Sequence, residues 1–124
     1  MELQIKTQTL EEATVLEVAG ELEIYTAPRL QEHIEAQLAQ GKKTLIVNLG
    51  QVEFIDSTGL AVLNAARVRL RDQGGKLLLI CNKERVLRPF AISGLDHLFS
   101  IYPTPEAALA ALAERKAHSD GPHS

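Results

Sequence analysis

An apolar run followed by a hydroxyl-bearing helix start constrains how this chain can fold. Residues 44–49 are strand-like, and their centre, Leu45-Ile46-Val47, shows no polar alternation, as in a strand buried on both faces. Asp56-Ser57-Thr58 follows, and apolar residues then recur at helical spacing as far as Asp72. Because Asp, Ser and Thr oxygens accept backbone N–H bonds at helix starts, the segment predicts a strand, a tight loop and a helix from about Thr58. In open α/β sheets, ligands and partners bind at such loops.

The N-terminal part of the chain predicts a pair of strands and then a helix. Residues 3–6 alternate between apolar and polar side chains, and residues 14–19 form a second strand that Gly20 is expected to end. After an acidic loop, residues 21–25, Thr26 is expected to cap the first helix. The predicted buried stripe of this helix is Ala27, Leu30, Ile34 and Leu38.

The remaining segments predict two helix breaks, two strands and two helices. Gly41 and Gly74-Gly75 are placed to end the first two helices, and residues 76–81 form an apolar strand. Asn82 is expected to cap a short or kinked helix, because Pro89 inside it removes a backbone donor. A brief strand and a last helix are expected at residues 98–102 and from Pro105 onward, with Ala108, Leu109 and Leu112 facing inward.

These segments predict an α/β fold in the order β-β-α-β-α-β-α-β-α. Strands separated by helices imply parallel neighbours, and the opening hairpin adds an antiparallel pair, so the sheet is mixed. A length of 124 residues predicts about one domain, which we place at residues 1–114. The polar residues 115–124, with Gly121 and Pro122, are expected to form a disordered tail.

Composition argues against several functional classes. The formal charge is -3, from 13 basic and 16 acidic residues without a basic stripe, which argues against nucleic acid as the main partner. The single cysteine, Cys81, excludes an internal disulfide and fits a reducing compartment. No apolar run approaches the ~20 residues that span a bilayer, and residues 1–6 lack the features of a signal peptide. We therefore expect a cytoplasmic protein without membrane insertion.

The chain also lacks the residue patterns of common active sites. A nucleophilic Ser57 would need an adjacent base, and the G-x-S-x-G elbow is absent because Ile55 and Asp56 precede the serine. One cysteine cannot form a thiolate cluster, and no G-x-x-x-x-G-K-[ST] phosphate loop is present. We expect no catalysis, no metal and no cofactor. No zinc-ligand spacing occurs among the histidines, which are His33, His97, His118 and His123.

Three short motifs resemble those of the STAS domain family. Asp56-Ser57-Thr58-Gly59-Leu60 is similar to the family signature around a phosphorylated serine. Residues 20–27, GELEIYTA, resemble the pattern G-E-L-D-x-x-T-A, although Glu23 replaces the commoner Asp and Tyr25 a polar residue. Ile92-Ser93-Gly94-Leu95 is similar to a late S-G-L. The resemblance runs from about Leu3 to Leu112, and it extends to the single-domain bacterial anti-sigma factor antagonists.

This resemblance implies both a fold and a function. The fold would be the STAS fold, a mixed sheet of four to five strands with about four helices. The unphosphorylated protein would bind an anti-sigma factor with serine kinase activity and so release a sigma factor. That kinase would use ATP to phosphorylate Ser57 and end the complex, and a PP2C-type serine phosphatase would restore it. A weak homodimer is a further expectation.

The expected partner surface surrounds Ser57. A phosphate at a helix N-terminus meets backbone N–H groups and the positive end of the helix dipole, so it should alter docking and leave the fold intact. Leu60 is expected to lie outside the core stripe of the helix and to be free for a partner. We read Thr58 as a capping residue. The expected partner contacts are Glu21, Glu23, Tyr25, Asp56, Thr58, Gly59, Leu60 and Asn64.

Other interpretations remain open from the sequence alone. Residues 56–58 could be a helix cap and nothing more, Leu60 an ordinary exposed leucine, and Glu21 and Glu23 a solvated turn. A STAS domain can also serve as an accessory subunit of a lipid-transporting ABC system or as a stress-signalling scaffold. Direct nucleotide binding is a third, weaker alternative.

Overall fold

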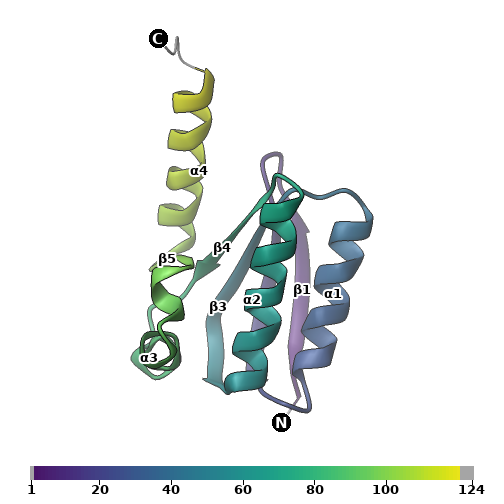
Figure 1. The fold of residues 1–124 in the computed structure, drawn as a ribbon, viewed down its shortest axis with the longest axis vertical. Helices are drawn as coiled ribbons and strands as arrows, with labels where there is room; N and C mark the ends of the chain where they lie inside the picture. The colour runs from purple at the N-terminus through teal and green to yellow at the C-terminus, as the bar shows by residue number, and fades with distance from the viewer. Residues whose placement is uncertain (1, 121–124) are drawn as a thin grey trace.

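Five strands form one mixed sheet: β1 (Gln4–Thr9), β2 (Thr14–Leu22), β3 (Thr44–Ile55), β4 (Lys76–Ile80) and β5 (Ser100–Tyr102). The structure is a computed structural model that describes residues 2–120. The spatial order of the strands is also their order along the chain (Figure 1). β1 and β2 pair antiparallel, and every later strand pairs parallel to its predecessor.

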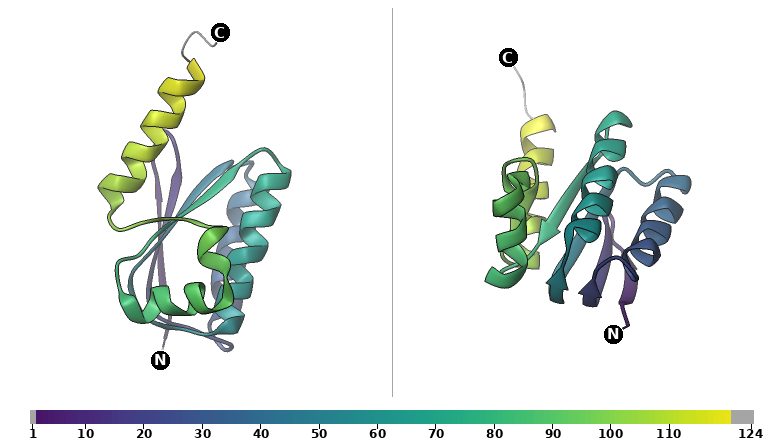
Figure 2. Two further views of the ribbon diagram at one scale, coloured as in Figure 1. Left: turned by 60° about the vertical axis from the view of Figure 1, so that its left-hand side comes forward. Right: turned by 60° about the horizontal axis from the view of Figure 1, so that its bottom comes forward.

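Four α-helices cover the two faces of this sheet: α1 (Ala27–Ala39), α2 (Ser57–Asp72), α3 (Glu84–Ser93) and α4 (Pro105–Asp120). A short 3-10 turn, η1 (Leu95–His97), links α3 to β5. The buried side chains of α1, α2 and α3 belong to one hydrophobic cluster, and those of α4 belong to a second. Figure 2 shows α4 on the opposite side of the sheet from α1 and α2. The observed order and the mixed sheet confirm the predicted α/β fold.

The central strands supply both clusters, which explains why their sequences show no alternation. Leu45 and Val47 face the cluster of α1, α2 and α3, whereas Ile46 between them faces the cluster of α4. On β4, Leu77 and Leu79 face the first cluster in the same way. All of these residues are buried, which confirms the prediction of strands covered on both faces.

The second half of β3 is irregular, and this irregularity sets which side chains reach the surface near its end. The pairing of β2 with β3 shifts register twice between Glu17 and Glu21. At the first shift, the side-chain oxygen of Asn48 accepts a hydrogen bond from the Gly50 N–H at 2.9 Å. As a result, the inward-facing residues of this half recur every third position, at Leu49, Val52 and Ile55.

Several local predictions are confirmed. Gly41 and Gly74 follow α1 and α2 with positive φ angles of 79° and 78°, as expected of helix-ending glycines. α3 is short, with ten residues, and it contains Pro89. The whole predicted stripe of α1 is buried, at Ala27, Leu30, Ile34 and Leu38.

Two strands are longer than predicted. β2 does not end at Gly20, which instead adopts a φ of 113° at the second register shift and lets the strand continue to Leu22. Glu21 therefore lies in a strand and not in the acidic loop. β3 likewise continues beyond the apolar run 44–49 to Ile55, one residue before Asp56.

Other local predictions are wrong at element ends. Lys83, not Asn82, occupies the N-cap of α3, and no side chain caps this helix. The last strand begins at Ser100, because Leu98 follows the η1 turn and is exposed. In α4, Leu109 is 38% exposed, whereas Ala108 and Leu112 are buried against the sheet as expected.

The C-terminal helix extends beyond the predicted domain boundary. α4 runs to Asp120, so the predicted disordered tail, residues 115–124, falls partly on this helix and partly on residues 121–124, which lie outside the described residues. The domain boundary at residue 114 remains a prediction. No helix within residues 2–120 combines the length and the hydropathy that a bilayer crossing requires.

The prediction that Leu60 lies outside the core stripe of α2 is wrong. Its side chain is 7% exposed and belongs to the cluster of α1, α2 and α3. Because β3 and the end of β2 reach further than predicted, the sheet also covers the first turn of α2. Leu60 is therefore a core residue in this conformation.

Replacing Leu60 by Ala should destabilise the fold by about 2–5 kcal/mol, because a buried leucine leaves a cavity when it is truncated. The matched control is Leu98→Ala, since Leu98 is 53% exposed and its truncation should change stability by about 0.5 kcal/mol or less. Urea unfolding of the two variants measures the difference. Equal stabilities would contradict the placement of Leu60 in the core.

Candidate functional site

Ser57 is the first residue of α2, and only Asp56 separates it from the end of β3. Its side chain is exposed, and no hydrogen bond joins its hydroxyl to any residue in the described part of the chain. The serine thus lies at the carboxyl edge of the parallel strands, where open α/β sheets bind their ligands and partners. Its hydroxyl is accessible to another protein.

Asp56 is the N-cap of α2. Its backbone is extended, and its Oδ1 atom accepts a hydrogen bond from the Gly59 N–H at 3.0 Å. Its own N–H donates to the Leu22 carbonyl oxygen at 3.1 Å, which ties the helix start to the end of β2. Asp56 therefore performs the capping that we predicted for Thr58, and that prediction is wrong.

The second carboxylate oxygen of Asp56 holds the loop between β2 and α1. Its Oδ2 atom accepts a hydrogen bond from the Ile24 N–H at 3.1 Å, across 32 residues of sequence. One side chain thus joins the start of α2 to the segment that carries Ile24 and Tyr25. This contact places two distant segments next to Ser57.

The loop is also organised by its own side chains. Glu23 Oε1 accepts hydrogen bonds from the N–H groups of Tyr25 and Thr26, at 2.9 and 3.1 Å. The Thr26 hydroxyl donates to the Glu21 carbonyl oxygen at 2.6 Å and accepts from the Glu23 N–H at 3.0 Å. Thr26 occupies the N-cap position of α1, but its hydroxyl is used in the loop and does not cap the helix. Glu23 is accordingly more than a solvated turn residue.

Three large apolar side chains are exposed around this loop. Ile24 is 59% exposed, Tyr25 85% and Phe54 49%. Phe54 lies opposite Glu21 in the pairing of β2 with β3. Together with Ser57 we call these residues the Ser57 surface. Tyr25 was predicted as a partner contact, whereas Ile24 and Phe54 were missed. The exposure of Phe54 follows from the register shifts of β3 against β2, which have no local signal in the sequence.

Gly59 has a packing role. It is buried, and a Cβ atom there would lie 2.8 Å from both the Leu22 carbonyl oxygen and the Leu22 side chain, and 2.9 Å from the Ile55 side chain. The glycine therefore lets α2 approach the ends of β2 and β3. In this conformation Gly59 and Leu60 are both covered by the protein itself, and their contact with a partner remains a prediction.

The other predicted helix residues are only partly available. Thr58 is half-buried and lines a groove between α1 and α2.

The Asn64 side-chain oxygen accepts two hydrogen bonds from the Arg67 guanidinium, at 3.1 Å from Nε and 2.9 Å from Nη2. That guanidinium lies over the ring of Phe99, 5.7 Å from its centre. Asn64 thus orients Arg67, and its contact with a partner remains a prediction.

The surroundings of Ser57 offer little for catalysis. Both oxygens of the adjacent Asp56 carboxylate already accept backbone N–H groups, so this group is not placed to activate the hydroxyl. Burial raises the pKa of the Cys81 thiol, which disfavours the reactive thiolate. Within residues 2–120, no group of three or more His, Cys, Asp or Glu side chains is placed to hold a metal ion. Among the described residues, the Ser57 hydroxyl is therefore exposed without a positioned base.

Comparison with known proteins identifies the family. Residues 4–108 match the family model of the STAS domain. The chain belongs to the STAS domain family. The anti-sigma-B factor antagonist of Staphylococcus aureus is 33% identical over 101 residues, which cover 82% of this chain and 94% of that STAS protein.

Solved STAS structures are also similar. An anti-sigma factor antagonist from Mycobacterium paratuberculosis has a TM-score of 0.83 and 31% identity, over 90% of this chain and 95% of the other. The cell fate determinant SpoIIAA of Bacillus, in its phosphorylated form, has a TM-score of 0.69 and 22% identity, over 88% and 99% of the two chains. The second likeness shows a shared fold only.

Replacing Asp56 by Ala should remove both of its hydrogen bonds. We expect a loss of about 1–2 kcal/mol in stability, typical of a lost N-cap, and faster hydrogen exchange at the Gly59 and Ile24 amides. Asp56→Asn is the matched control, because an asparagine oxygen can still cap Gly59 while its NH₂ group cannot accept from Ile24. That variant should accelerate exchange at Ile24 alone. Unchanged protection of Ile24 in both variants would contradict the role assigned to Asp56.

Proposed function

We propose that this STAS protein is an anti-sigma factor antagonist whose Ser57 surface binds an anti-sigma factor and whose affinity is controlled by phosphorylation of Ser57. The observation that carries the proposal is an exposed, unbonded serine hydroxyl at a helix start, flanked by three exposed apolar side chains. Similar proteins that bear the name anti-sigma factor antagonist support the same reading.

The apolar residues of the Ser57 surface supply the binding energy in this proposal. Exposed aromatic residues in a cluster are typical of protein interfaces, and tyrosine is enriched among residues that dominate affinity. Tyr25 and Ile24 are held in place by backbone hydrogen bonds to Glu23 and Asp56. A surface ordered before binding loses less conformational entropy on docking.

A phosphate on Ser57 would oppose that docking. It carries nearly two negative charges at neutral pH and would stand beside the carboxylate of Asp56, near Glu21 and Glu23. The start of α2 tolerates the charge, because unpaired N–H groups and the helix dipole favour anions there. The added charge should therefore weaken binding of the partner and leave the fold of this chain intact. Disrupting the centre of an interface costs on the order of 2–4 kcal/mol, and each 1.4 kcal/mol is about tenfold in affinity.

In this mechanism the chain is a substrate and a binding protein, not an enzyme. The anti-sigma factor is itself the serine kinase. It transfers the γ-phosphoryl group of ATP to the Ser57 oxygen, which loses its proton, and ADP is released. Bound to the unmodified protein, the anti-sigma factor releases its sigma factor. A PP2C-type serine phosphatase hydrolyses the phosphoserine and restores binding.

Ser57→Ala should stay folded, take up no phosphate from the anti-sigma kinase of the same organism, and bind that kinase constitutively. The kinase for this test is a small protein of the histidine-kinase ATPase type, to be sought among the genes that neighbour this one. Thr58→Ala is the matched control, since it removes the neighbouring hydroxyl and should leave phosphorylation intact. Mass spectrometry after incubation with kinase and ATP measures the phosphate added to each variant. Phosphate on Ser57→Ala at the parental level would show that the site is wrong.

Tyr25→Ala should weaken binding of the kinase by about tenfold or more, as for a central aromatic contact, without lowering stability by more than about 0.5 kcal/mol. The small effect on stability follows from an exposed fraction of 85%. Leu98→Ala, which removes an exposed apolar side chain outside the Ser57 surface, is the control. Isothermal titration calorimetry measures both affinities, and equal values would exclude Tyr25 from the interface.

A further inference from the structure

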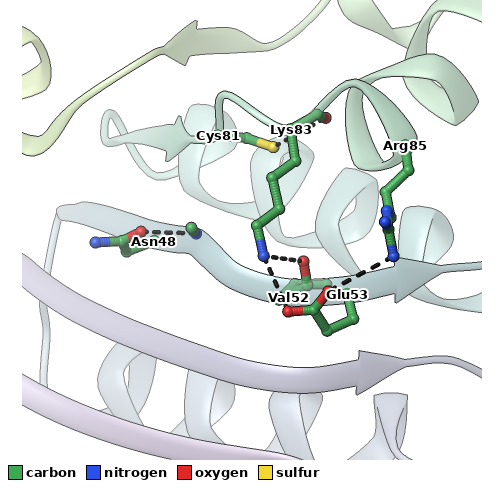
Figure 3. Close-up of polar contacts among 7 residues, drawn as sticks. Asn48, Val52, Glu53, Cys81, Lys83 and Arg85 are labelled. Atoms are coloured by element: carbon green, nitrogen blue, oxygen red, sulfur yellow. Dashed lines mark hydrogen bonds and ion pairs between the residues drawn. The ribbon is translucent and has the colours of Figure 1, made fainter.

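A charged groove lies along α3, beside the end of β3. It has a volume of about 710 Å³. Lys83 and Arg85 both reach toward Glu53 of β3 (Figure 3). We call this feature the α3 groove, defined by Glu53, Lys83, Glu84, Arg85, Arg88, Pro89 and Ile92.

Positive charge exceeds negative charge in the α3 groove. Lys83 Nζ lies 3.0 Å from Glu53 Oε2, and Arg85 Nη1 lies 3.6 Å from Glu53 Oε1. Arg88 Nε lies 3.6 Å from Glu84 Oε2 within α3. The hydrogen bond and the charge of Lys83 hold the pKa of Glu53 below its usual range, so this carboxylate is ionised. Three cations thus face two carboxylates.

The two arginines can exchange their present ion pairs for those of a partner. The side chains of Arg85 and Arg88 are 70% and 67% exposed. Exposed ion pairs at this distance contribute little to stability, and a guanidinium has several further donors for carboxylate oxygens. A carboxylate of another protein can therefore bind here at small cost to this fold.

The same groove also has an apolar part. Pro89 is half-buried, and Ile92, one turn further along α3, is 79% exposed. Ile92 begins the motif Ile92-Ser93-Gly94-Leu95, and none of these residues belongs to the Ser57 surface. An occupant that matches both parts carries acidic groups and an apolar side chain.

The α3 groove adjoins the Ser57 surface with the opposite charge. Glu53 of the groove and Phe54 of the Ser57 surface are consecutive exposed residues of β3. Three acidic residues lie near Phe54, namely Glu21 at the end of β2, Glu23 in the β2–α1 loop and Asp56 at the start of α2, whereas the groove carries the surplus of cations. A partner that covers both must present a complementary charge pattern, which fixes the direction in which it docks.

We propose that the α3 groove binds an acidic segment of the anti-sigma factor, and that an apolar side chain of this segment packs on Pro89 and Ile92. The inference rests on the proposed function, because it assigns the groove to the same partner. It adds the chemistry of the contacting segment and a second contact area that Ser57 does not touch.

Charge reversal of the two exposed arginines tests the proposal. Arg85→Glu/Arg88→Glu should weaken binding of the anti-sigma kinase by about tenfold or more at about 50 mM salt, and by much less at about 500 mM, because salt screens exposed charges. The control Lys6→Glu/Arg71→Glu makes the same change in net charge on β1 and at the far end of α2, and should leave affinity within about twofold. Ile92→Ser should weaken binding at both salt concentrations. Circular dichroism verifies that each variant is folded.

The outcomes separate this proposal from the one on which it rests. Selective, salt-dependent loss in the arginine variant, with loss in Ile92→Ser, supports the α3 groove as the site of an acidic segment. If the kinase binds the parent and the arginine variant equally well, or if the control loses as much, the groove proposal is overturned while the proposed function stands. If the kinase does not bind the parent protein, both proposals fail.

Discussion

The two hydrogen bonds accepted by the Asp56 carboxylate hold the candidate site together. One oxygen caps α2 at Gly59, and the other holds the β2–α1 loop at Ile24. The two segments are separated in the chain by α1 and β3. The Asp56 side chain joins them in addition to the pairing of β2 with β3 and the bond from the Asp56 N–H to the Leu22 carbonyl oxygen. The Ser57 hydroxyl and the apolar side chains of the loop form one surface as a consequence. A single short acidic residue thus links the start of α2 to the β2–α1 loop of the candidate site.

The sheet topology positions the surface on which the proposed phosphorylation would act. Parallel strands joined by helices place the ends of β2 and β3 at one edge, and Gly59 lets α2 pack closely on both. The covered first turn of α2 leaves Ser57 as its exposed side chain. A phosphate added to Ser57 at this edge of the sheet would change the charge of the surface far more than its shape. In the proposed mechanism docking is controlled through electrostatics, and the α3 groove contributes a neighbouring area of opposite charge.

The sequence predicted the order of elements, the doubly covered strands and the position of Ser57, because hydrophobic periodicity and helix-ending glycines are local signals. It did not predict the bulges of β3, which depend on pairing with β2 and decide that Phe54 is exposed while Ile55 is buried. Leu60 was misplaced for a related reason: helical spacing gives the angle of a side chain, but the extent of the sheet beneath it is a tertiary property. The Asp56–Ile24 contact spans 32 residues and has no local signal at all.

The central claim is that phosphorylation of Ser57 alters docking and leaves the architecture intact. The most direct measurement compares the affinity of the anti-sigma kinase for the unmodified protein and for the purified Ser57-phosphorylated protein, with amide NMR spectra of both forms. The account predicts a loss of about 30-fold or more, equivalent to about 2 kcal/mol, with spectral changes confined to the neighbourhood of Ser57 and the β2–α1 loop. Equal affinity of the two forms, or loss of the folded spectrum on phosphorylation, would contradict it.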